Sequence, residues 1–183
     1  MNGEISLRFY NVNDEVNAVK RSAKEYGFDD LVIVPYVRND DMAVDLTSEM
    51  LSDMGLDEDT VFEKGFKNLN YTISTIRAMY MKLLEIDEDN PILDMLFPED
   101  LNIYVVTTEE MILGATAILV AGGALRNRFG DTGYVVVPLS INEMLVSPYD
   151  EDTLEKRVNA LKAVNESEDG KFKLSDKAYV FKA

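Results

Sequence analysis

The chain of 183 residues contains no cysteine and no histidine. Without cysteine there is no disulfide framework, no thiolate metal site and no thiol nucleophile, a composition that fits the reducing cytoplasm. Without histidine, the common catalytic triads and dyads lack their base, and structural zinc sites lack their usual ligands. We therefore expect a cytoplasmic, non-enzymatic protein with no catalytic residue, no cofactor and no metal.

The chain also lacks a long apolar run, and no basic N-terminal segment precedes such a run. The longest uncharged stretch, Met111–Leu125, has 15 residues and contains three glycines. A membrane helix needs about 20 apolar residues. We therefore expect a soluble protein with neither a signal peptide nor a membrane partner.

Basic residues are scarce: 18 Lys and Arg stand against 34 Asp and Glu, a net charge of −16 with a pI near 4.3. Phosphate contacts need a basic face, so we do not expect direct binding to free nucleic acid. An acidic surface favours a basic protein as partner, including proteins that themselves hold nucleic acid.

Most of the negative charge lies in two segments. Asn39–Lys64 has a net charge of −8 and Glu85–Glu110 one of −9, so the rest of the chain is nearly neutral. One interpretation is a solvated surface that needs no partner. In the other, both segments face the same way and present a phosphate-like array to a basic groove. The residues of that predicted surface are Asp40, Asp41, Asp45, Asp53, Asp57, Glu58, Asp59, Glu63, Glu85, Asp87, Glu88 and Asp89.

Two acidic clusters are also conceivable cation sites, because carboxylates bind magnesium and calcium. These are Asp40 with Asp41 and Asp45, and the run Asp87–Asp89. The second does not fit the calcium-loop pattern, since Pro91 and Ile92 stand where an acid or amide and the turn glycine belong. Loop and helix-cap roles explain both clusters better.

Apolar periodicity and turn residues predict an α+β fold with a largely antiparallel sheet covered by helices. The expected strands are Ile5–Tyr10, Leu31–Val37, Met42–Leu46, Ile103–Thr107, Leu113–Leu119, Tyr134–Pro138, Glu143–Ser147 and Ala178–Phe181. The expected helices are 14–26, Thr47–Met54, a helix capped by Asp57, Thr72–Ile86, Ile92–Phe97, Ala121–Phe129 and a helix opened by Asp152 and Glu155. The glycine pair Gly122–Gly123 is interpreted as a strand-to-helix turn. Pro35 predicts an edge strand or a short one, because proline lacks a backbone donor.

No linker or repeat divides the chain, so residues 1–183 are predicted to form one domain. Within it, residues 1–100 are expected to be mostly helical with one or two strands, and residues 101–183 to be rich in sheet.

The segments LNIYVVTTEEMILGATAIL and GYVVVPLSINEMLVSP resemble the C-terminal half of an uncharacterised bacterial domain family. That family reads YVLTN, then GAAALLYPGVL, then LPSSIHEVLLLP. LKAVNESE, LSDKAYVF, RNDDMAVDL and EMLSDMGLDEDTVFEKGFKN are similar to its other segments, so the likeness covers roughly residues 31–181. The resemblance implies a fold but no reaction, and Asn142 stands where the family has histidine.

Small size, acidity and the absence of cysteine give a looser resemblance to anti-CRISPR proteins. Our first hypothesis is therefore an acidic binding protein that inhibits a basic nucleic-acid-handling enzyme, most concretely a Cas9-like CRISPR nuclease with its guide RNA. The alternative is an enzyme or small-ligand protein that uses the PLSINEM segment, with Ser140, Asn142 and Glu143 around a pocket.

Overall fold

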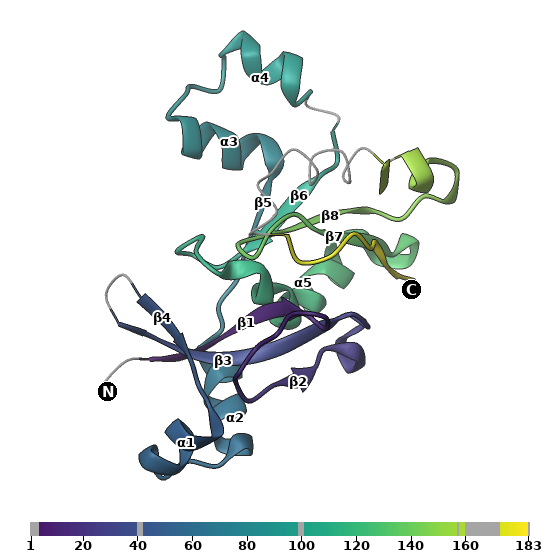
Figure 1. Ribbon diagram of the computed structural model, residues 1–183. Coiled ribbons are helices and arrows are strands. Elements are labelled where there is room, and N and C mark those ends of the chain that lie inside the picture. Colours follow the sequence, from purple (N-terminus) through teal and green to yellow (C-terminus); the bar gives the residue numbers. More distant parts are fainter. Residues whose placement is uncertain (1–3, 40–41, 99–100, 157, 160–172, 183) are drawn as a thin grey trace.

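The computed structural model of the protein describes residues 4–39, 42–98, 101–156, 158–159 and 173–182. In this part of the chain, the strands form two antiparallel sheets (Figure 1). The strands are β1 (Ile5–Asn11), β2 (Arg21–Ser22), β3 (Leu31–Asn39), β4 (Met42–Asp45), β5 (Thr72–Thr75), β6 (Tyr104–Thr107), β7 (Tyr134–Pro138), β8 (Met144–Pro148) and β9 (Tyr179–Phe181). The α-helices are α1 (Ser48–Met54), α2 (Glu58–Asn68), α3 (Ile76–Leu84), α4 (Pro91–Leu96) and α5 (Ile118–Phe129), and residues 151–156 are also helical. Short 3-10 helices are η1 (Lys24–Tyr26), η2 (Gly114–Ala117) and η3 (Gly130–Thr132).

The first sheet has the order β1-β3-β2, with β4 also paired to β3. Pro35 therefore lies in a central strand of nine residues, although the sequence predicts an edge strand or a short one. Its carbonyl accepts a hydrogen bond from the Leu46 amide at 3.0 Å, so its backbone faces the side of β2 and β4. On that side β2 pairs with Val32 and Ile33, and β4 pairs from Tyr36 onward. The missing N–H falls between the two short partners, which is why this strand tolerates proline.

The second sheet has the order β5-β6-β8-β7-β9, and all its pairings are antiparallel. Val136 and Val146 face the main core, whereas Val135 and Leu145 face a second cluster on the opposite side. Both faces of this sheet are covered, which explains its nearly continuous apolar strands.

The main core joins one face of each sheet to η2, α5 and the buried side chains of α1 and α2, and η2 and α5 lie between the two sheets (Figure 1). Gly65 of α2 packs on this core at Leu7, where a Cβ would come within 2.5 Å of the leucine side chain. The outer edge of β1 is protected because the side chains of Asn68 and Thr116 donate to the carbonyls of Ile5 and Leu7. On the far side of the second sheet, Met79 of α3 packs on the second cluster.

The α+β class and the antiparallel pairing are confirmed, with two sheets in place of one. Residues 1–100 contain five strands, β1–β5, so the prediction of a mostly helical part with one or two strands is wrong. The predicted helix over 14–26 is also wrong. Asp14 accepts from the Asn11 amide behind it at 2.8 Å and so does not cap a helix ahead. The amides of Val19 and Ala23 bond instead to Leu46 and Leu31.

Two further predictions fail for identifiable reasons. The β-branched residues Thr72–Thr75 pair with β6 as β5, so the helix begins only at Ile76. The expected strand Leu113–Leu119 is η2 running into α5. A short apolar run does not distinguish a buried strand from a buried helix. Gly122 and Gly123 consequently lie inside α5, and not at a strand-to-helix turn.

Candidate binding surface

The helices α3 and α4 form a hairpin that projects from the second sheet (Figure 1). Thr75 caps α3 by accepting from the Ala78 amide at 3.1 Å, and Asn90 caps α4 by accepting from the Ile92 amide at 3.0 Å. Pro91 occupies the first turn of α4, where a missing N–H costs no helical bond. Glu85 ends α3 in the left-handed conformation, with φ 52°, so the chain reverses there.

Arg77 holds this hairpin together from within. Its guanidinium donates to the carbonyl oxygens of Phe97 at 3.1 Å and Glu88 at 2.8 Å, and it pairs with Asp94 at 2.8 Å. The rings of Tyr80 and Phe97 stack with centroids 4.5 Å apart. The hairpin is therefore organised before any partner arrives.

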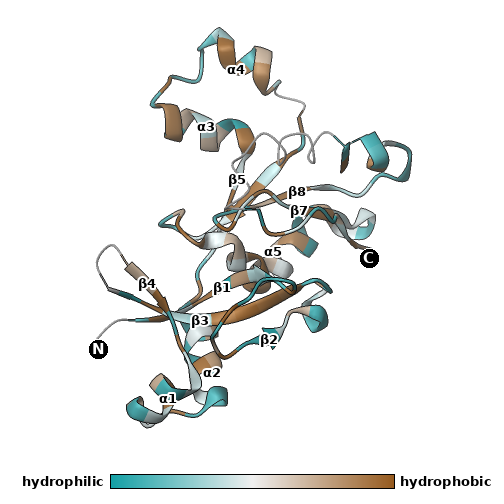
Figure 2. Cartoon of the chain, in the orientation of Figure 1, coloured by the Kyte–Doolittle hydropathy of each residue, from teal (hydrophilic) through white to brown (hydrophobic). Residues whose placement is uncertain are grey.

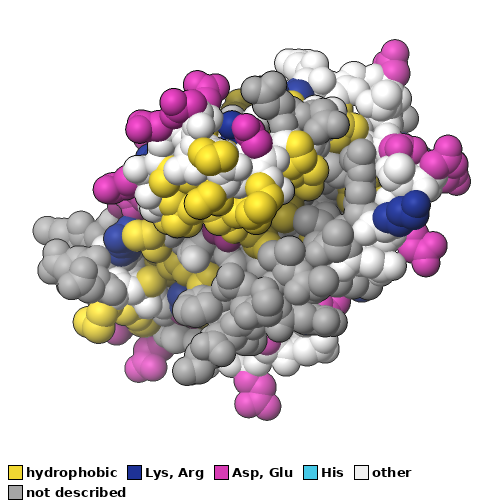
Figure 3. Space-filling model, turned by 90° about the horizontal axis from the view of Figure 1, so that it is seen from above, with side chains coloured by type: hydrophobic (Ala, Val, Ile, Leu, Met, Phe, Trp, Pro, Cys, Tyr) yellow, Lys and Arg dark blue, Asp and Glu magenta, His cyan; other side chains and the backbone are white. Residues whose placement is uncertain are grey.

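The outer surface of the hairpin is apolar. Figure 3 shows yellow side chains gathered on this end of the molecule, and Figure 2 shows hydrophobic residues along both helices. Five large apolar side chains are each at least 51% exposed: Leu83, Leu84, Ile92, Met95 and Leu96. We call these five residues the apolar patch. Such a gathering of large exposed side chains is unusual for a surface whose only role is solvation.

Acidic side chains stand beside the apolar patch. Glu85 and the run Asp87–Asp89 are all exposed and belong to the loop that joins α3 to α4. Figure 3 shows acidic side chains at the margin of the yellow area. This surface therefore combines apolar area with negative charge.

The other predicted acids lie elsewhere. Asp53, Asp57, Glu58, Asp59 and Glu63 belong to α1, α2 and the turn between them, and all five are exposed. Figure 1 places α1 and α2 at the opposite end of the molecule from α3 and α4, with both sheets in between. Among the described acids, those of α1 and α2 therefore do not join Glu85 and Asp87–Asp89 in the expected single surface.

Several of these acids have structural partners. Asp57 caps α2 by accepting from the Thr60 amide at 2.7 Å, and Asp59 pairs with Arg21. Asp45 accepts from Arg8 and from the Tyr10 hydroxyl, both at 2.7 Å. Burial, together with the bond to Asp45, raises the pKa of Tyr10 to about 12. Asp40 and Asp41 lie outside the described residues.

The residues of the alternative pocket form the turn between β7 and β8. Ser140 is only 6% exposed, and its hydroxyl accepts from the Asn142 amide at 3.0 Å. The Asn142 side chain accepts from the Leu113 amide at 2.8 Å, and the Glu143 carbonyl accepts from the Ser140 amide at 3.3 Å. Ser140 and Asn142 therefore position the start of η2, and none of the three hollows described below is lined by these turn residues.

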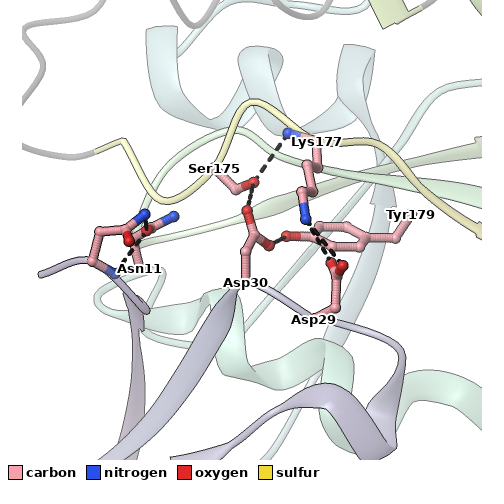
Figure 4. A network of polar contacts seen from close by, with 7 residues as sticks. Asn11, Asp29, Asp30, Ser175, Lys177 and Tyr179 are labelled. Carbon is pink, nitrogen blue, oxygen red and sulfur yellow. Dashed lines mark hydrogen bonds and ion pairs between the residues drawn. The ribbon is translucent and has the colours of Figure 1, made fainter.

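A polar network fastens the C-terminal segment to the first sheet (Figure 4). Asp30 accepts from the hydroxyls of Ser175, at 2.7 Å, and Tyr179, while Lys177 pairs with Asp29 at 3.0 Å. Burial and the bond to Asp30 raise the pKa of the Tyr179 hydroxyl, which keeps it protonated. Each of these groups is engaged in holding β9, so we assign the network a structural role.

Hollows in the described part of the surface include three that bear on these predictions. One of about 590 Å³ lies between the 25–28 turn and α5. A polar one of about 140 Å³ contains Arg38 and Thr108, whose hydroxyl is buried without a hydrogen-bond partner. The third, about 120 Å³, is lined by Arg77 at the base of the hairpin.

The apolar patch is not among the predicted sites. Apolar residues at helical spacing, such as Leu83 and Leu84 in the predicted helix Thr72–Ile86, normally face a core, yet Met79 is the only buried residue of α3. The sequence does contain one sign of an exposed apolar surface. Between Ile76 and Leu84 the apolar side chains surround the helix, more than one packed face needs. Such a helix either lies deep in a core or meets a partner.

Among the described residues, no three acidic side chains are grouped so that they could hold a metal ion. Within that same part of the chain, no helix has the length and apolar character to cross a bilayer.

Comparison with known proteins gives a match to a family model. No curated protein and no solved structure matches the chain significantly. A family model described as a family of unknown function, DUF5688, matches residues 12–183. The match covers every helix described above and every strand except β1. The chain therefore belongs to DUF5688, a family of unknown function.

Proposed function

We propose that this domain is a non-enzymatic binding protein that recognises a basic amphipathic segment of a partner protein through the α3–α4 hairpin. The observation that carries this proposal is the apolar patch beside Glu85 and Asp87–Asp89. An amphipathic helix with lysines or arginines beside its apolar face would bury the patch and meet the acids.

The internal organisation of the hairpin supports this function. Because Arg77 already fixes α3 against α4, little of the binding free energy is spent on ordering the surface. This proposal also limits the predicted phosphate-like array to one of the two acidic segments. The two acidic ends face different directions, so a basic groove would meet only one of them at a time.

A Cas9-like nuclease with its guide RNA remains a concrete partner of this kind, because such enzymes hold nucleic acid in a positively charged channel. In this proposal the hairpin docks on a basic segment of the enzyme and inhibits it. Size and acidity are the observations that support this choice of enzyme.

The binding test uses a synthetic amphipathic peptide of leucine and lysine, titrated calorimetrically at low salt. A peptide with glutamate in place of lysine is the matched control. We expect only the lysine peptide to bind. The triple variant Asp87→Lys, Glu88→Lys and Asp89→Lys should lower its affinity about tenfold or more, since each lost charge contact slows association and weakens the complex.

The other end of the molecule supplies the matched variant. Asp53→Lys, Glu58→Lys and Glu63→Lys make the same change in net charge on α1 and α2, and should leave the affinity nearly unchanged. An equal loss of affinity in both triple variants would show that net charge alone drives binding. It would refute the proposal that the α3–α4 hairpin is the binding surface. The same pair of variants, added to a guide-loaded Cas9 cleavage assay, tests the nuclease as partner. If the unaltered protein does not inhibit cleavage, Cas9 is excluded as the partner, but the proposed binding surface is not refuted.

A further inference from the structure

The hollow between the 25–28 turn and α5 has the size of a small-molecule site. Its volume of about 590 Å³ falls within the range of roughly 300–1,000 Å³ that is usual for ligand pockets. Two elements far apart in sequence form it, the 25–28 turn and α5, and Phe181 of β9 completes it. It lies away from α3 and α4, so it is independent of the function proposed above.

One wall of this hollow is aromatic and fixed in place. The rings of Tyr134 and Phe181 stack with centroids 5.0 Å apart, and Phe28 packs against Phe181 at 5.7 Å. Gly27, with φ 92°, brings the turn so close that a Cβ there would lie 2.7 Å from the Phe181 ring. Tyr134 and Phe28 are at most 4% exposed and hold Phe181 in place, so the partly exposed Phe181 ring provides the apolar surface of this wall.

The opposite wall is the bare backbone of α5 at Gly122 and Gly123. After proline, glycine is the least favourable residue in a helix interior. Most other described glycines have a local reason for lacking a side chain. At Gly65, Gly114 and Gly133 a Cβ would come within 2.5 Å of a neighbour, and Gly27, Gly55 and Gly130 have positive φ.

Neither reason applies to the glycine pair of α5. A Cβ on Gly123 would meet nothing within 4 Å, and one on Gly122 would meet only the guanidinium of Arg126, at 3.6 Å. The described structure does not need these glycines for its own packing. A molecule lying flat against the helix would need them, because only glycine lets it approach the backbone closely.

Arg126 supplies the charge of the site. It lines the hollow from the last turn of α5, and among the described residues it has no carboxylate within ion-pair distance. Its neighbour Arg128, by contrast, lies over the Tyr104 ring at 4.6 Å. Glu25 lines the facing side of the hollow, and burial together with the Glu25 charge raises the pKa of the Tyr26 hydroxyl.

From these observations we infer that the hollow is a binding site for a small planar apolar molecule that carries an anionic group. The planar part lies between the aromatic wall and the glycine backbone, and the anionic group accepts hydrogen bonds from Arg126.

The test is an amide NMR titration with naphthoate, using uncharged naphthylmethanol as the matched probe. Naphthoate should produce saturable shifts at the amides of Gly27, Gly122 and Gly123, and should bind about tenfold more tightly than the alcohol. Arg126→Gln should lower naphthoate affinity to that of the alcohol and leave the affinity for the alcohol unchanged. Arg128→Gln, in the same helical turn, is the control and should change neither affinity.

A second variant fills the site. Gly123→Leu places a side chain in the open space and should abolish binding of both probes while raising the Tm, because leucine favours a helix. The inference is overturned if naphthoate gives no saturable shift or shifts only amides of α3 and α4. It is equally overturned if folded Gly123→Leu still binds, or if Arg126→Gln binds naphthoate as the unaltered protein does.

Discussion

The two acidic ends of this protein carry similar charge but are built differently. At the α1–α2 end the large apolar side chains point inward, and Val61, Phe62 and Leu51 are at most 3% exposed. At the α3–α4 end five large apolar side chains are exposed beside the acids. Charge alone therefore does not distinguish a solvated surface from a binding surface. The apolar area next to the charge makes that distinction.

The largest expected difference between the two ends is the loss of unfolding free energy when an apolar side chain is truncated. Phe62→Ala should lower the free energy of unfolding by about 3–5 kcal/mol, because Phe62 is only 1% exposed and its removal leaves a cavity under Arg21. Met95→Ala should change it by less than about 0.5 kcal/mol, since Met95 is 75% exposed. Urea denaturation measures both. A large loss with Met95→Ala would mean that the patch is packed within the protein and is not a docking surface.

A second experiment asks whether the two ends unfold separately. Arg77→Gln removes the charged donor of two carbonyls and the partner of Asp94, and should destabilise the hairpin by about 1.5–3 kcal/mol. Amide hydrogen exchange should accelerate in α3 and α4 and stay unchanged in α2. Faster exchange in α2 as well would show that the hairpin and the main core form one cooperative unit.

Local signals were enough to predict part of the fold. The helix α2 begins where Asp57 can cap it, and α1 ends at Gly55, which has the left-handed φ of 64°. Both features depend on residues close in sequence. The segment 14–26 could not be predicted in this way, because Val19 and Ala23 bond to strands that follow later in the chain.

The same limit applies to the candidate surface. The sequence shows that acids are abundant in two segments, but their relative placement depends on how the two sheets stack. The apolar patch could not be predicted for a related reason. An apolar residue at helical spacing is normally assigned to the core. Leu83 and Leu84 have that spacing, but the second sheet contacts α3 mainly through Met79.

The smallest expected difference between the two ends is the response of their helix caps to acidic pH. Asp57 caps α2 with a carboxylate, and the hydrogen bonds from Thr60 lower the pKa of Asp57 below its usual 3.8. The helix α3 is capped by the Thr75 hydroxyl, which does not titrate in this range. A carboxyl whose pKa is lowered by folding stabilises the native state above its unfolded pKa, and this contribution disappears as the pH falls through the folded pKa. Amide exchange at Thr60 should therefore lose protection on acidification, while the cap at Ala78 persists.

Asp57→Asn separates this titration from general acid unfolding, because asparagine caps a helix about as well but carries no titrating group. In this variant the protection of Thr60 relative to Ala78 should no longer depend on pH between about 5 and 2. If the variant and the unaltered protein lose protection at Thr60 in parallel, acid acts on the fold as a whole. The α2 cap would then contribute nothing that distinguishes the α1–α2 end from the hairpin.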